Sequence, residues 1–345
     1  MVSILITGGT GFIGISLVKR LHTLGHHLKL LIRESSDITP FEGLKNIEYF
    51  IGDVRDIESL YNAANGVELI YHLAGQVSVW AKDKKSYYAI NVQGAENIAK
   101  VALKNDLLLF YISSFGALGP NPMECEEPTD ESCVHVDFFI NEYERTKFLG
   151  REKVRDYMGK GLKTVILYPG FVYGPNDFNI YGEMIFDIVA DQFLGLPGKG
   201  DALFCMAYID DVINGMINLI DREDLIGQEF VLGGENIKIR EYLNLIAELA
   251  KVKKPRRIPM WAGVLYGRLC RFKADLSKKR VPYITPDMII GMKYNWAYSS
   301  RNALEKLGYR ITPIRDGLTQ TVEWYKEFIK TNGKNKKKIG IRMIK

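Results

Sequence analysis

Three closely spaced glycines near the N-terminus constrain the fold of this chain more than any other feature. The stretch "ILITGGTGFIGISLVKRL" places Gly8, Gly11 and Gly14 between an apolar run and an amphipathic segment. Glycines at this spacing permit a tight turn from a strand into a helix, and they let a pyrophosphate approach the free N–H groups at the helix start. The pattern therefore predicts a dinucleotide-binding turn, with a plain turn as the alternative.

Short apolar runs alternate with helical stretches through the first half of the chain. The runs expected to form buried parallel strands are 2–7, 28–32, 47–51, 68–74, 107–113 and 163–168. Between the first two runs, residues 12–24 carry apolar side chains at helical spacing. Repeated strand–helix–strand units predict an α/β fold of the Rossmann type, in which a doubly wound parallel sheet has helices on both faces.

Beyond residue 174 the alternation loosens into loops that contain many glycines and prolines. Helices are expected there at 182–193, 239–250, 260–272 and 314–329. We expect a dinucleotide-binding domain over 1–174 and a smaller C-terminal substrate-binding lobe over 175–330, with some segments of the lobe returning to the sheet. A basic tail, 331–345, follows the lobe.

The helix expected at 260–272, "MWAGVLYGRLCRF", combines aromatic and apolar side chains with Arg268 and Arg271. Its apolar side chains are expected to form part of the core of the lobe. The alternative is a contact between this helix and a membrane surface, which could deliver a lipid-like substrate.

The net charge of +5 comes from the basic tail. Residues 331–345 hold six Lys or Arg residues and no acidic residue, so the rest of the chain has 40 basic and 41 acidic residues. This balance argues against a nucleic-acid partner. The tail is expected to be a solvated end, with a weak contact to anionic lipid or RNA as the alternative.

The cysteines and the apolar runs bear on metal binding and location. Cys125, Cys133, Cys205 and Cys270 lie far apart without a Cys-x-x-Cys pair, which argues against a metal site or a disulfide scaffold. No apolar run approaches the ~20 residues of a membrane span. The N-terminal sequence also lacks the pattern of a signal peptide. We therefore expect a cytoplasmic protein without a transmembrane segment.

The end of the second predicted strand bears on the choice of dinucleotide. An acidic residue at this position would bind the ribose 2′-hydroxyl of NAD. Here the strand "LKLLIR" ends in Arg33, which can pair with a 2′-phosphate, aided by Ser35 and Ser36. NADP(H) is therefore favoured and NAD(H) is possible. A solvated strand end is the alternative interpretation of Arg33.

The stretch "NEYERTKFLG" places Tyr143 four residues before Lys147. Four residues span about one helical turn, so the phenol and the ammonium lie on the same helix face. A free tyrosine titrates near pH ~10, and a neighbouring cation lowers that pKa. The pair is therefore interpreted as a tuned acid, and a surface cation–aromatic pair is the alternative.

Several motifs occur in the order found in one enzyme superfamily. They are "TGGTGFIG", "GDVRD", "YHLAG", "NVQG", "ISSFGALG", "YERTK", "YPGFVYGP" and "AYIDDV", followed by "LGGENIKIREYL" and "ALEKLGYRITPIRDGLTQTVEWY". Over about residues 1–330 the chain resembles the extended short-chain dehydrogenases/reductases, the NAD-dependent epimerase/dehydratase superfamily. Within it, the chain is most similar to the dihydroflavonol 4-reductase-like branch, which includes hopanoid-associated sugar-epimerase-like proteins.

The resemblance implies catalytic roles for Ser114, Tyr143 and Lys147. Lys147 would lower the pKa of Tyr143 and hold the ribose hydroxyls, and Ser114 would donate a hydrogen bond to the substrate carbonyl. Tyr143 would give that oxygen a proton as hydride arrives from the nicotinamide, and would act as the base in the oxidative direction.

The resemblance also assigns most of the cofactor contacts. Asp53 and Val54 would contact the adenine, and Leu73 to Gly75 would lie under the nicotinamide ribose. Asn91 would contact the cofactor, although a helix cap is the alternative for this residue. The expected cofactor contacts are, in full, Gly8, Gly11, Phe12, Ile13, Gly14, Arg33, Asp53, Val54, Leu73, Ala74, Gly75, Asn91, Ser113, Tyr143, Lys147, Pro169, Gly170 and Val172.

Site residues help to choose among the reactions of this superfamily. Sugar-nucleotide dehydratases carry Thr-Asp-Glu where this chain has Ser114, Phe115 and Gly116, so a dehydratase is not expected. Nucleotide-sugar epimerases have an arginine that grips the diphosphate where this chain has Phe204, and many have a second arginine at the position of Tyr168. Lys199 or Arg301 could hold a diphosphate elsewhere.

These differences favour an uncharged, partly apolar small-molecule substrate. We expect an NADP(H)-dependent oxidoreductase that interconverts a ketone and a secondary alcohol, and that forms a homodimer. An epimerase that uses transient oxidation is the alternative, and a non-catalytic NADP(H)-binding sensor is a lesser one.

Overall fold

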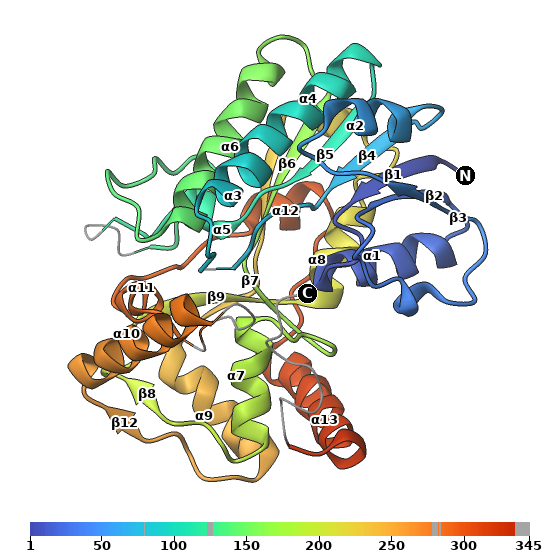
Figure 1. The fold of residues 1–345 in the computed structure, drawn as a ribbon. Helices are drawn as coiled ribbons and strands as arrows, with labels where there is room; N and C mark the ends of the chain where they lie inside the picture. Colours follow the sequence, from blue (N-terminus) through green and yellow to red (C-terminus); the bar gives the residue numbers. More distant parts are fainter. Residues whose placement is uncertain (79, 123–126, 278–281, 283, 335–345) are drawn as a thin grey trace.

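The computed structural model describes residues 1–78, 80–122, 127–277, 282 and 284–334. Within these residues, seven parallel strands form one sheet in the order β10-β6-β5-β4-β1-β2-β3 (Figure 1). The strands are β1 (Ser3–Thr7), β2 (His27–Ile32), β3 (Ile47–Ile51), β4 (Leu69–His72), β5 (Leu108–Ile112), β6 (Thr164–Pro169) and β10 (Glu229–Leu232). The strand order runs outward from β1 in both directions, which confirms the doubly wound α/β fold.

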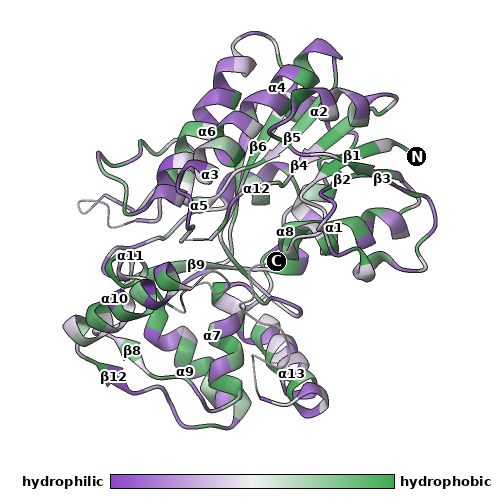
Figure 2. Ribbon diagram, viewed as in Figure 1, coloured by the Kyte–Doolittle hydropathy of each residue, from purple (hydrophilic) through white to green (hydrophobic). Residues whose placement is uncertain are grey.

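Apolar side chains fill the centre of this sheet. Figure 2 shows hydrophobic residues concentrated along β4, β5 and β6, and the side chains of β4 and β6 are all buried. The six predicted strands all form, within two residues of the expected bounds. β10 was not predicted: its four residues "EFVL" follow the region where the strand–helix alternation loosens, and they pair with β6.

β3 does not match the prediction of a buried strand. It is the edge strand of the sheet, where Tyr49 is 38% exposed and Ile51 is 69% exposed. A strand at the edge has a neighbour on one side only, so its side chains are covered less than those of a central strand. The apolar run 47–51 therefore predicted the strand but not its burial.

Helices cover both faces of the sheet (Figure 1). α2 (Ile57–Ala64), α4 (Gly94–Lys104) and α6 (Glu142–Met158) pack against one another on one face, and α1 (Phe12–Thr23) packs with α8 (Ile209–Ile217) on the other. The shorter elements of this half are α3 (Lys85–Tyr88), a π-helical turn (Ala89–Gln93), α5 (Phe115–Leu118) and a 3₁₀ turn (Thr39–Phe41).

The C-terminal part of the chain builds a second group of elements beneath the carboxyl ends of the strands (Figure 1). In the described residues, β7 (Phe171–Tyr173), β9 (Leu203–Tyr208) and β11 (Glu235–Lys238) form a small sheet, and β8 (Leu196–Pro197) pairs with β12 (Arg257–Ile258). The helices of this group are α7 (Ile180–Val189), α9 (Ile239–Ala250), α10 (Met260–Leu276), α11 (Pro286–Gly291) and α13 (Ile314–Asn332). The C-terminal part also contains α12 (Arg301–Lys306) and a 3₁₀ turn at Glu223–Leu225. The division at residue 174 stays a prediction, since α8, β10 and α12 lie against the large sheet.

α10 contradicts the expectation that helix 260–272 forms part of the lobe core. Its large apolar side chains are exposed, with Trp261 at 71% and Phe272 at 62%. The buried residues of the helix are instead Gly263, Gly267 and Ala274. The expectation failed because small residues occupy the packing face of this helix.

None of the described helices is both long and apolar enough to cross a membrane. Within the basic tail, residues 335–345 lie outside the described residues. The expected role of the tail therefore stays a prediction. The expected homodimer and the expected cytoplasmic location stay predictions as well.

Candidate active site

The glycine turn connects β1 to α1 and packs tightly against the neighbouring chain. Gly8 has a φ of 74°, and a Cβ at this residue would lie 2.6 Å from the backbone nitrogen of Ala74. A Cβ at Gly14 would lie 2.2 Å from the carbonyl oxygen of Gly8. No side chain fits at these distances, so the fold itself requires both glycines.

Gly11 differs from these two glycines in a way that points to a ligand. A Cβ at Gly11 would meet only the carbonyl oxygen of Gly8, at 3.4 Å. Gly11 is the N-cap of α1, makes no side-chain capping bond and is followed by no acidic residue in the first turn. The helix start thus offers N–H groups beside an open backbone, which fits the pyrophosphate of a dinucleotide. Phe12 and Ile13 begin the helix and pack partly against the core.

The carboxyl ends of β2 and β3 bring three charged residues together. The guanidinium of Arg55 donates two hydrogen bonds, of 2.8 and 2.7 Å, to the carboxylate of Asp53. These bonds hold the pKa of Asp53 below its usual value, and the charge of Arg33 contributes to the same shift. Arg33 is exposed, and its backbone turns through hydrogen bonds with Ser36. The sequence analysis missed Arg55, although "GDVRD" contains it.

Asn91 holds the loop that follows β4. Its Oδ1 accepts a hydrogen bond of 2.7 Å from the backbone N–H of Gln76, and its Nδ2 donates to the Gln76 carbonyl and to Thr146. Asn91 lies inside the π-helical turn, so the helix-cap alternative is wrong. A Cβ at Gly75 would lie 3.3 Å from Asn91 Oδ1 and 3.8 Å from the Nζ atom of Lys147. The loop Leu73–Gly75 thus lies beside Lys147.

Asp53 is followed by Val54, which packs under the start of α4. A Cβ at Gly94 would lie 2.8 Å from a methyl group of Val54, and Asn97 donates a hydrogen bond of 3.0 Å to the Val54 carbonyl. These contacts fix the Asp53–Val54 backbone from the side of α4, at the same edge of the sheet as the glycine turn.

Ser114 and Tyr143 form a hydrogen-bonded pair. The Tyr143 hydroxyl donates to Ser114 Oγ at 2.7 Å, and the backbone N–H of Gly116 donates to the same oxygen at 3.1 Å. Ser114 caps α5, while Tyr143 lies in the first turn of α6 behind the N-cap Asn141. The side chain of Ser113 is buried, and its Oγ finds no hydrogen-bond partner among the described residues.

The pKa values of Tyr143 and Lys147 differ from the prediction that the lysine lowers the pKa of the tyrosine. Burial raises the pKa of Tyr143 to about 12, although the hydrogen bond with Ser114 lowers it. Burial also lowers the pKa of Lys147 to about 8, and its ammonium donates a hydrogen bond of 3.2 Å to the Ile112 carbonyl. The pKa of Tyr143 is therefore raised and not lowered as expected, because desolvation of the phenolate outweighs the hydrogen bond with Ser114.

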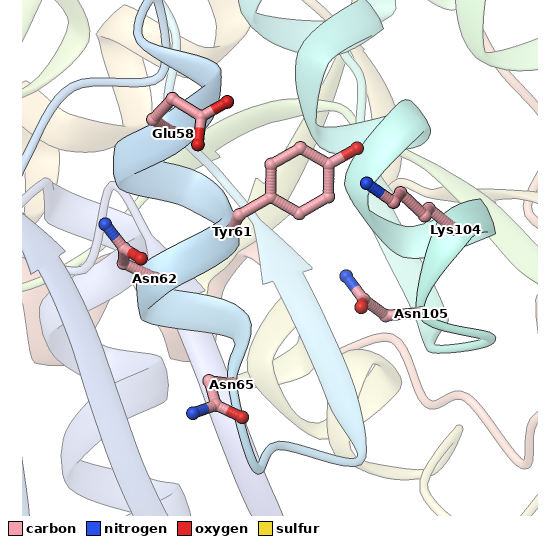
Figure 3. Close-up of a pocket in the computed structure, with 6 residues that line it drawn as sticks. All are labelled: Glu58, Tyr61, Asn62, Asn65, Lys104 and Asn105. Atoms are coloured by element: carbon pink, nitrogen blue, oxygen red, sulfur yellow. The ribbon is translucent and has the colours of Figure 1, made fainter.

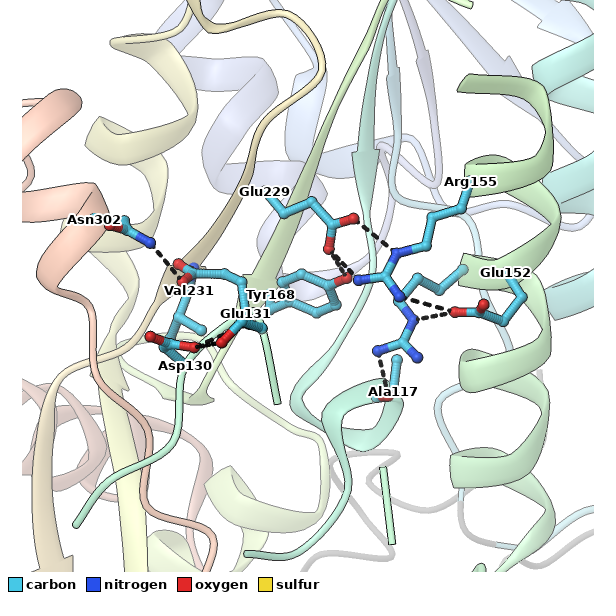
Figure 4. A network of polar contacts seen from close by, with 11 residues as sticks. Ala117, Asp130, Glu131, Glu152, Arg155, Tyr168, Glu229, Val231 and Asn302 are labelled. Atoms are coloured by element: carbon cyan, nitrogen blue, oxygen red, sulfur yellow. Dashed lines mark hydrogen bonds and ion pairs between the residues drawn. The ribbon is translucent and has the colours of Figure 1, made fainter. Parts of the chain in front are cut away.

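Two side chains that the sequence analysis missed fix the turn that contains Ser114. The buried guanidinium of Arg151 donates a hydrogen bond of 2.8 Å to the carbonyl of Ala117 (Figure 4). The hydroxyl of Tyr298 donates at 2.6 Å to the carbonyl of Gly119. Ser114 is therefore positioned from α6 and from the C-terminal part of the chain at once.

An aromatic cluster begins at Phe115, the residue after Ser114. The ring of Phe115 stacks on Phe171 with centroids 3.8 Å apart, and Phe171 contacts Phe204 at 4.8 Å and Tyr181 at 5.1 Å. Trp296 meets the edge of Phe115 at 5.5 Å. We call these five residues the aromatic cluster. Phe204, the position where an arginine would grip a diphosphate, belongs to it.

The aromatic cluster also lies close to Tyr143. The charge of Tyr143 contributes to the raised pKa of Tyr181, after the larger effect of burial. Next to the cluster, Pro169 ends β6 and Val172 lies in β7, paired with β9. A Cβ at Gly170 would lie 2.6 Å from the Cys205 carbonyl, so this glycine serves packing.

Tyr168 does not bear on substrate choice in the way that the sequence suggested. Its hydroxyl donates a hydrogen bond of 2.5 Å to Glu229, which also accepts two hydrogen bonds of 2.7 Å from Arg155 (Figure 4). Tyr168 is 1% exposed. It therefore belongs to an ion network between β6, β10 and α6. The residue at this position gives no evidence that the substrate is uncharged, so that use of Tyr168 is wrong.

A surface hollow of about 430 Å³ lies elsewhere, between the C-terminal ends of α2 and α4 (Figure 3). It is lined by Glu58, Tyr61, Asn62, Asn65, Lys104 and Asn105, and the ammonium of Lys104 lies 4.6 Å from the Tyr61 ring centroid. These helix ends lead into the amino ends of β4 and β5. The hollow therefore lies at the opposite edge of the sheet from Ser114 and the glycine turn.

Comparisons with known proteins agree with this geometry. The model of the "NAD dependent epimerase/dehydratase family" matches residues 4–233. The chain is 28% identical over 332 residues to "Sterol demethylase protein B" of Methylococcus capsulatus, covering 94% of this chain and 98% of that protein. It is 26% identical to a "Putative dihydroflavonol 4-reductase" of Synechocystis sp., covering 94% and 96%.

A solved structure shares the fold. The UDP-glucuronic acid 4-epimerase from Bacillus cereus, in complex with UDP-glucuronic acid and NAD, superposes with a TM-score of 0.73. It is 22% identical, and the match covers 94% of this chain and 99% of that chain. At this identity the likeness establishes the fold alone.

Proposed function

The chain belongs to the NAD-dependent epimerase/dehydratase family, and we propose that it is an NADP(H)-dependent oxidoreductase that interconverts a ketone and a secondary alcohol. One observation carries this proposal. The aromatic cluster stands next to the Ser114–Tyr143 pair and includes Phe204, where an epimerase would hold a diphosphate. The partly exposed rings of the cluster, Phe115 and Tyr181, can contact an apolar substrate, and the buried ring of Phe204 offers a diphosphate no charged hydrogen bond.

Tyr143 is the proton donor in this proposal. Because burial raises its pKa to about 12, the phenol stays protonated at neutral pH and has a proton to give to a carbonyl oxygen. When bound, the nicotinamide cofactor supplies the hydride to the carbonyl carbon in reduction and accepts it in oxidation. In the oxidative direction, only the phenolate form of Tyr143 can accept the proton of the alcohol.

Ser114 and Lys147 support this proton transfer. Ser114 Oγ accepts hydrogen bonds from Tyr143 and from the Gly116 backbone, so its own hydrogen is free to bind the substrate oxygen. Lys147, with a pKa of about 8, is mostly charged at pH 7 and lies beside the Leu73–Gly75 loop. There its ammonium can donate to the ribose hydroxyls and attract the developing phenolate.

The preference for NADP(H) rests on the charges at the ends of β2 and β3. Arg33 is exposed, and no acidic residue follows β2 at the position that would bind a 2′-hydroxyl. Arg55 adds a second guanidinium near Asp53 at the same edge. Because Asp53 already binds Arg55, Arg33 is the cation left to favour a cofactor that carries a 2′-phosphate.

The fate of the cofactor tests the proposal. The purified, dialysed protein is offered NADPH with a cyclic aromatic ketone or a 3-ketosteroid, and separately with UDP-glucose. We expect a largely cofactor-free protein that consumes one NADPH for each alcohol formed from a ketone. Retained dinucleotide, with interconversion of UDP-sugars and no net consumption of NADPH, would overturn the proposal in favour of an epimerase.

A further inference from the structure

α10 places its large apolar side chains on the outside of the molecule. Trp261 is 71% exposed and Leu276 is 72% exposed, and Leu265, Leu269 and Phe272 are each more than half exposed. At about 100° of rotation per residue, these five residues lie within an arc of about 80° on one face of the helix. We call them the α10 stripe. Together they expose an apolar area on the order of several hundred Å², which is large for a patch that only faces water.

The opposite face of α10 is the one that packs on the protein. A Cβ at Gly263 would lie 3.0 Å from the Pro197 side chain, and a Cβ at Gly267 would lie 2.9 Å from the Pro286 nitrogen. Ala274 is also buried on this face. Surface helices of globular proteins normally pack their large apolar residues inward. α10 does the reverse, so the α10 stripe has no role in the core of this chain.

Positive charge borders the α10 stripe on both sides. By the same rotation, Arg268 lies next to the stripe on one flank and Lys273 on the other, and both side chains are exposed. The segment that leads into the helix adds four exposed basic side chains, those of Lys253, Lys254, Arg256 and Arg257.

One acidic residue within α10, Asp275, is exposed and adds a negative charge on the flank that holds Arg268. Asp275 accepts a hydrogen bond of 3.0 Å from the indole of Trp80. An apolar stripe with cations along both flanks is complementary to the surface of an anionic bilayer, where apolar side chains enter the acyl boundary and cations meet the headgroups.

α10 is connected to two segments that adjoin residues of the candidate active site in the sequence. Through Asp275 it holds Trp80, which follows the Leu73–Gly75 loop by five residues. On its other side it packs against α11, where a Cβ at Gly291 would lie 4.0 Å from Ile140, three residues before Tyr143. A surface bound through α10 would therefore lie close to the site.

Exposed apolar side chains continue from α11 toward that site. Ile290 is 37% exposed, and Phe138 is 42% exposed and lies against Tyr294 with ring centroids 5.4 Å apart. The apolar surface thus extends from the α10 stripe toward the segment that precedes α6.

We propose that the α10 stripe is a docking surface for an anionic lipid bilayer, on which the helix lies in the plane of the interface. The helix has 17 residues, and charged side chains interrupt its apolar sequence, so it lies on a membrane and does not cross it. A second copy of the chain is a poorer occupant. Two α10 faces that meet across a twofold axis would bring Arg268 and Lys273 against their own counterparts, and like charges would oppose the contact.

Vesicle flotation tests this proposal without any substrate, so its outcome is independent of the proposed function. The probes are vesicles of pure phosphatidylcholine and of equimolar phosphatidylcholine and phosphatidylglycerol. We expect the protein to float with the anionic vesicles at low salt, and to bind them about tenfold or more weakly after Leu269→Ser with Phe272→Ser. Arg268→Gln with Lys273→Gln should weaken binding and reduce its dependence on salt.

Matched control variants distinguish docking through the α10 stripe from nonspecific binding to vesicles. Leu24→Ser removes a half-exposed apolar side chain at the end of α1, and it should leave binding unchanged. Bromine-labelled lipids should quench the fluorescence of Trp261, and Trp261→Phe should abolish most of that quenching while binding persists. Failure of the wild-type protein to float, unchanged binding by the stripe variant, or a dimer that buries the stripe in sedimentation would each overturn the proposal.

Discussion

α1 and α10 place their leucines in opposite ways. In α1, Leu17, Val18 and Leu21 are buried against the sheet together with Gly14. In α10 the glycines face the protein and the leucines face outward. Both sequences show apolar residues at helical spacing. The comparison teaches that such spacing identifies a helix and its faces, whereas the size of the residues opposite the apolar stripe decides which face is buried.

A pair of leucine substitutions would break this comparison most directly. Leu21→Ala should lower the free energy of unfolding by about 2–5 kcal/mol, because it leaves a cavity where the side chain is 0% exposed. Leu269→Ala should change it by less than about 0.5 kcal/mol, because Leu269 is 51% exposed. Chemical denaturation of both variants measures the difference. Equal losses of stability would mean that the α10 stripe is packed after all.

Two aspartates extend the comparison to charge. Asp53 has a lowered pKa because Arg55 binds it, whereas burial just before the start of α7 raises the pKa of Asp177 to about 7. The folded chain therefore holds the Asp177 proton over the range from pH ~4 to 7, where the unfolded chain has lost it. The unfolding free energy should fall as pH rises through this range, by up to about 1.4 kcal/mol per pH unit.

Asp177→Asn isolates this contribution. Asparagine keeps an oxygen that can accept the hydrogen bond of 2.8 Å from the Asn179 backbone N–H, but it carries no titrating group. Denaturation of both proteins at several pH values should show a smaller pH slope for the variant. Identical slopes would contradict the buried, protonated state of Asp177.

Arg33→Ala tests the predicted preference for NADP(H) over NAD(H). A charge-assisted contact with a 2′-phosphate contributes about 1.5–3 kcal/mol, so the substitution should weaken NADPH binding by roughly tenfold to a hundredfold. NADH carries no 2′-phosphate and should bind about equally to both proteins. Calorimetry with the two cofactors tests this prediction. It fails if the wild-type protein binds NADH as tightly as NADPH, or if the variant retains its NADPH affinity.

The sequence was informative where local pattern and burial agree. The apolar runs of β1, β4, β5 and β6 lie in the middle of a sheet, so their pattern predicted both strand and burial. The same reasoning predicted β3 but failed for its burial, because an edge is a property of strand order and not of composition. β10 was missed because it lies beyond residue 174, where the strand–helix alternation has loosened, and the sequence does not show that it pairs with β6.

The candidate site shows the same limit. The motifs predicted Ser114 and Tyr143 as site residues, and the structure places their side-chain oxygens 2.7 Å apart. The direction of the tyrosine pKa could not be predicted, because helical spacing reports a neighbouring cation and says nothing of burial. Arg151 and the aromatic cluster were missed because their partners lie far away in the sequence, as Phe115 and Trp296 do.

The turnover of Tyr143→Phe tests the central claim most directly. The substitution keeps the ring but removes the hydroxyl that meets Ser114, so it removes the transferable proton and little else. With a ketone that the wild-type protein reduces, we predict that turnover falls by ~10²-fold or more while NADPH affinity, measured alongside by calorimetry, is unchanged. Turnover close to that of the wild-type protein would contradict the assignment of Tyr143 as the acid.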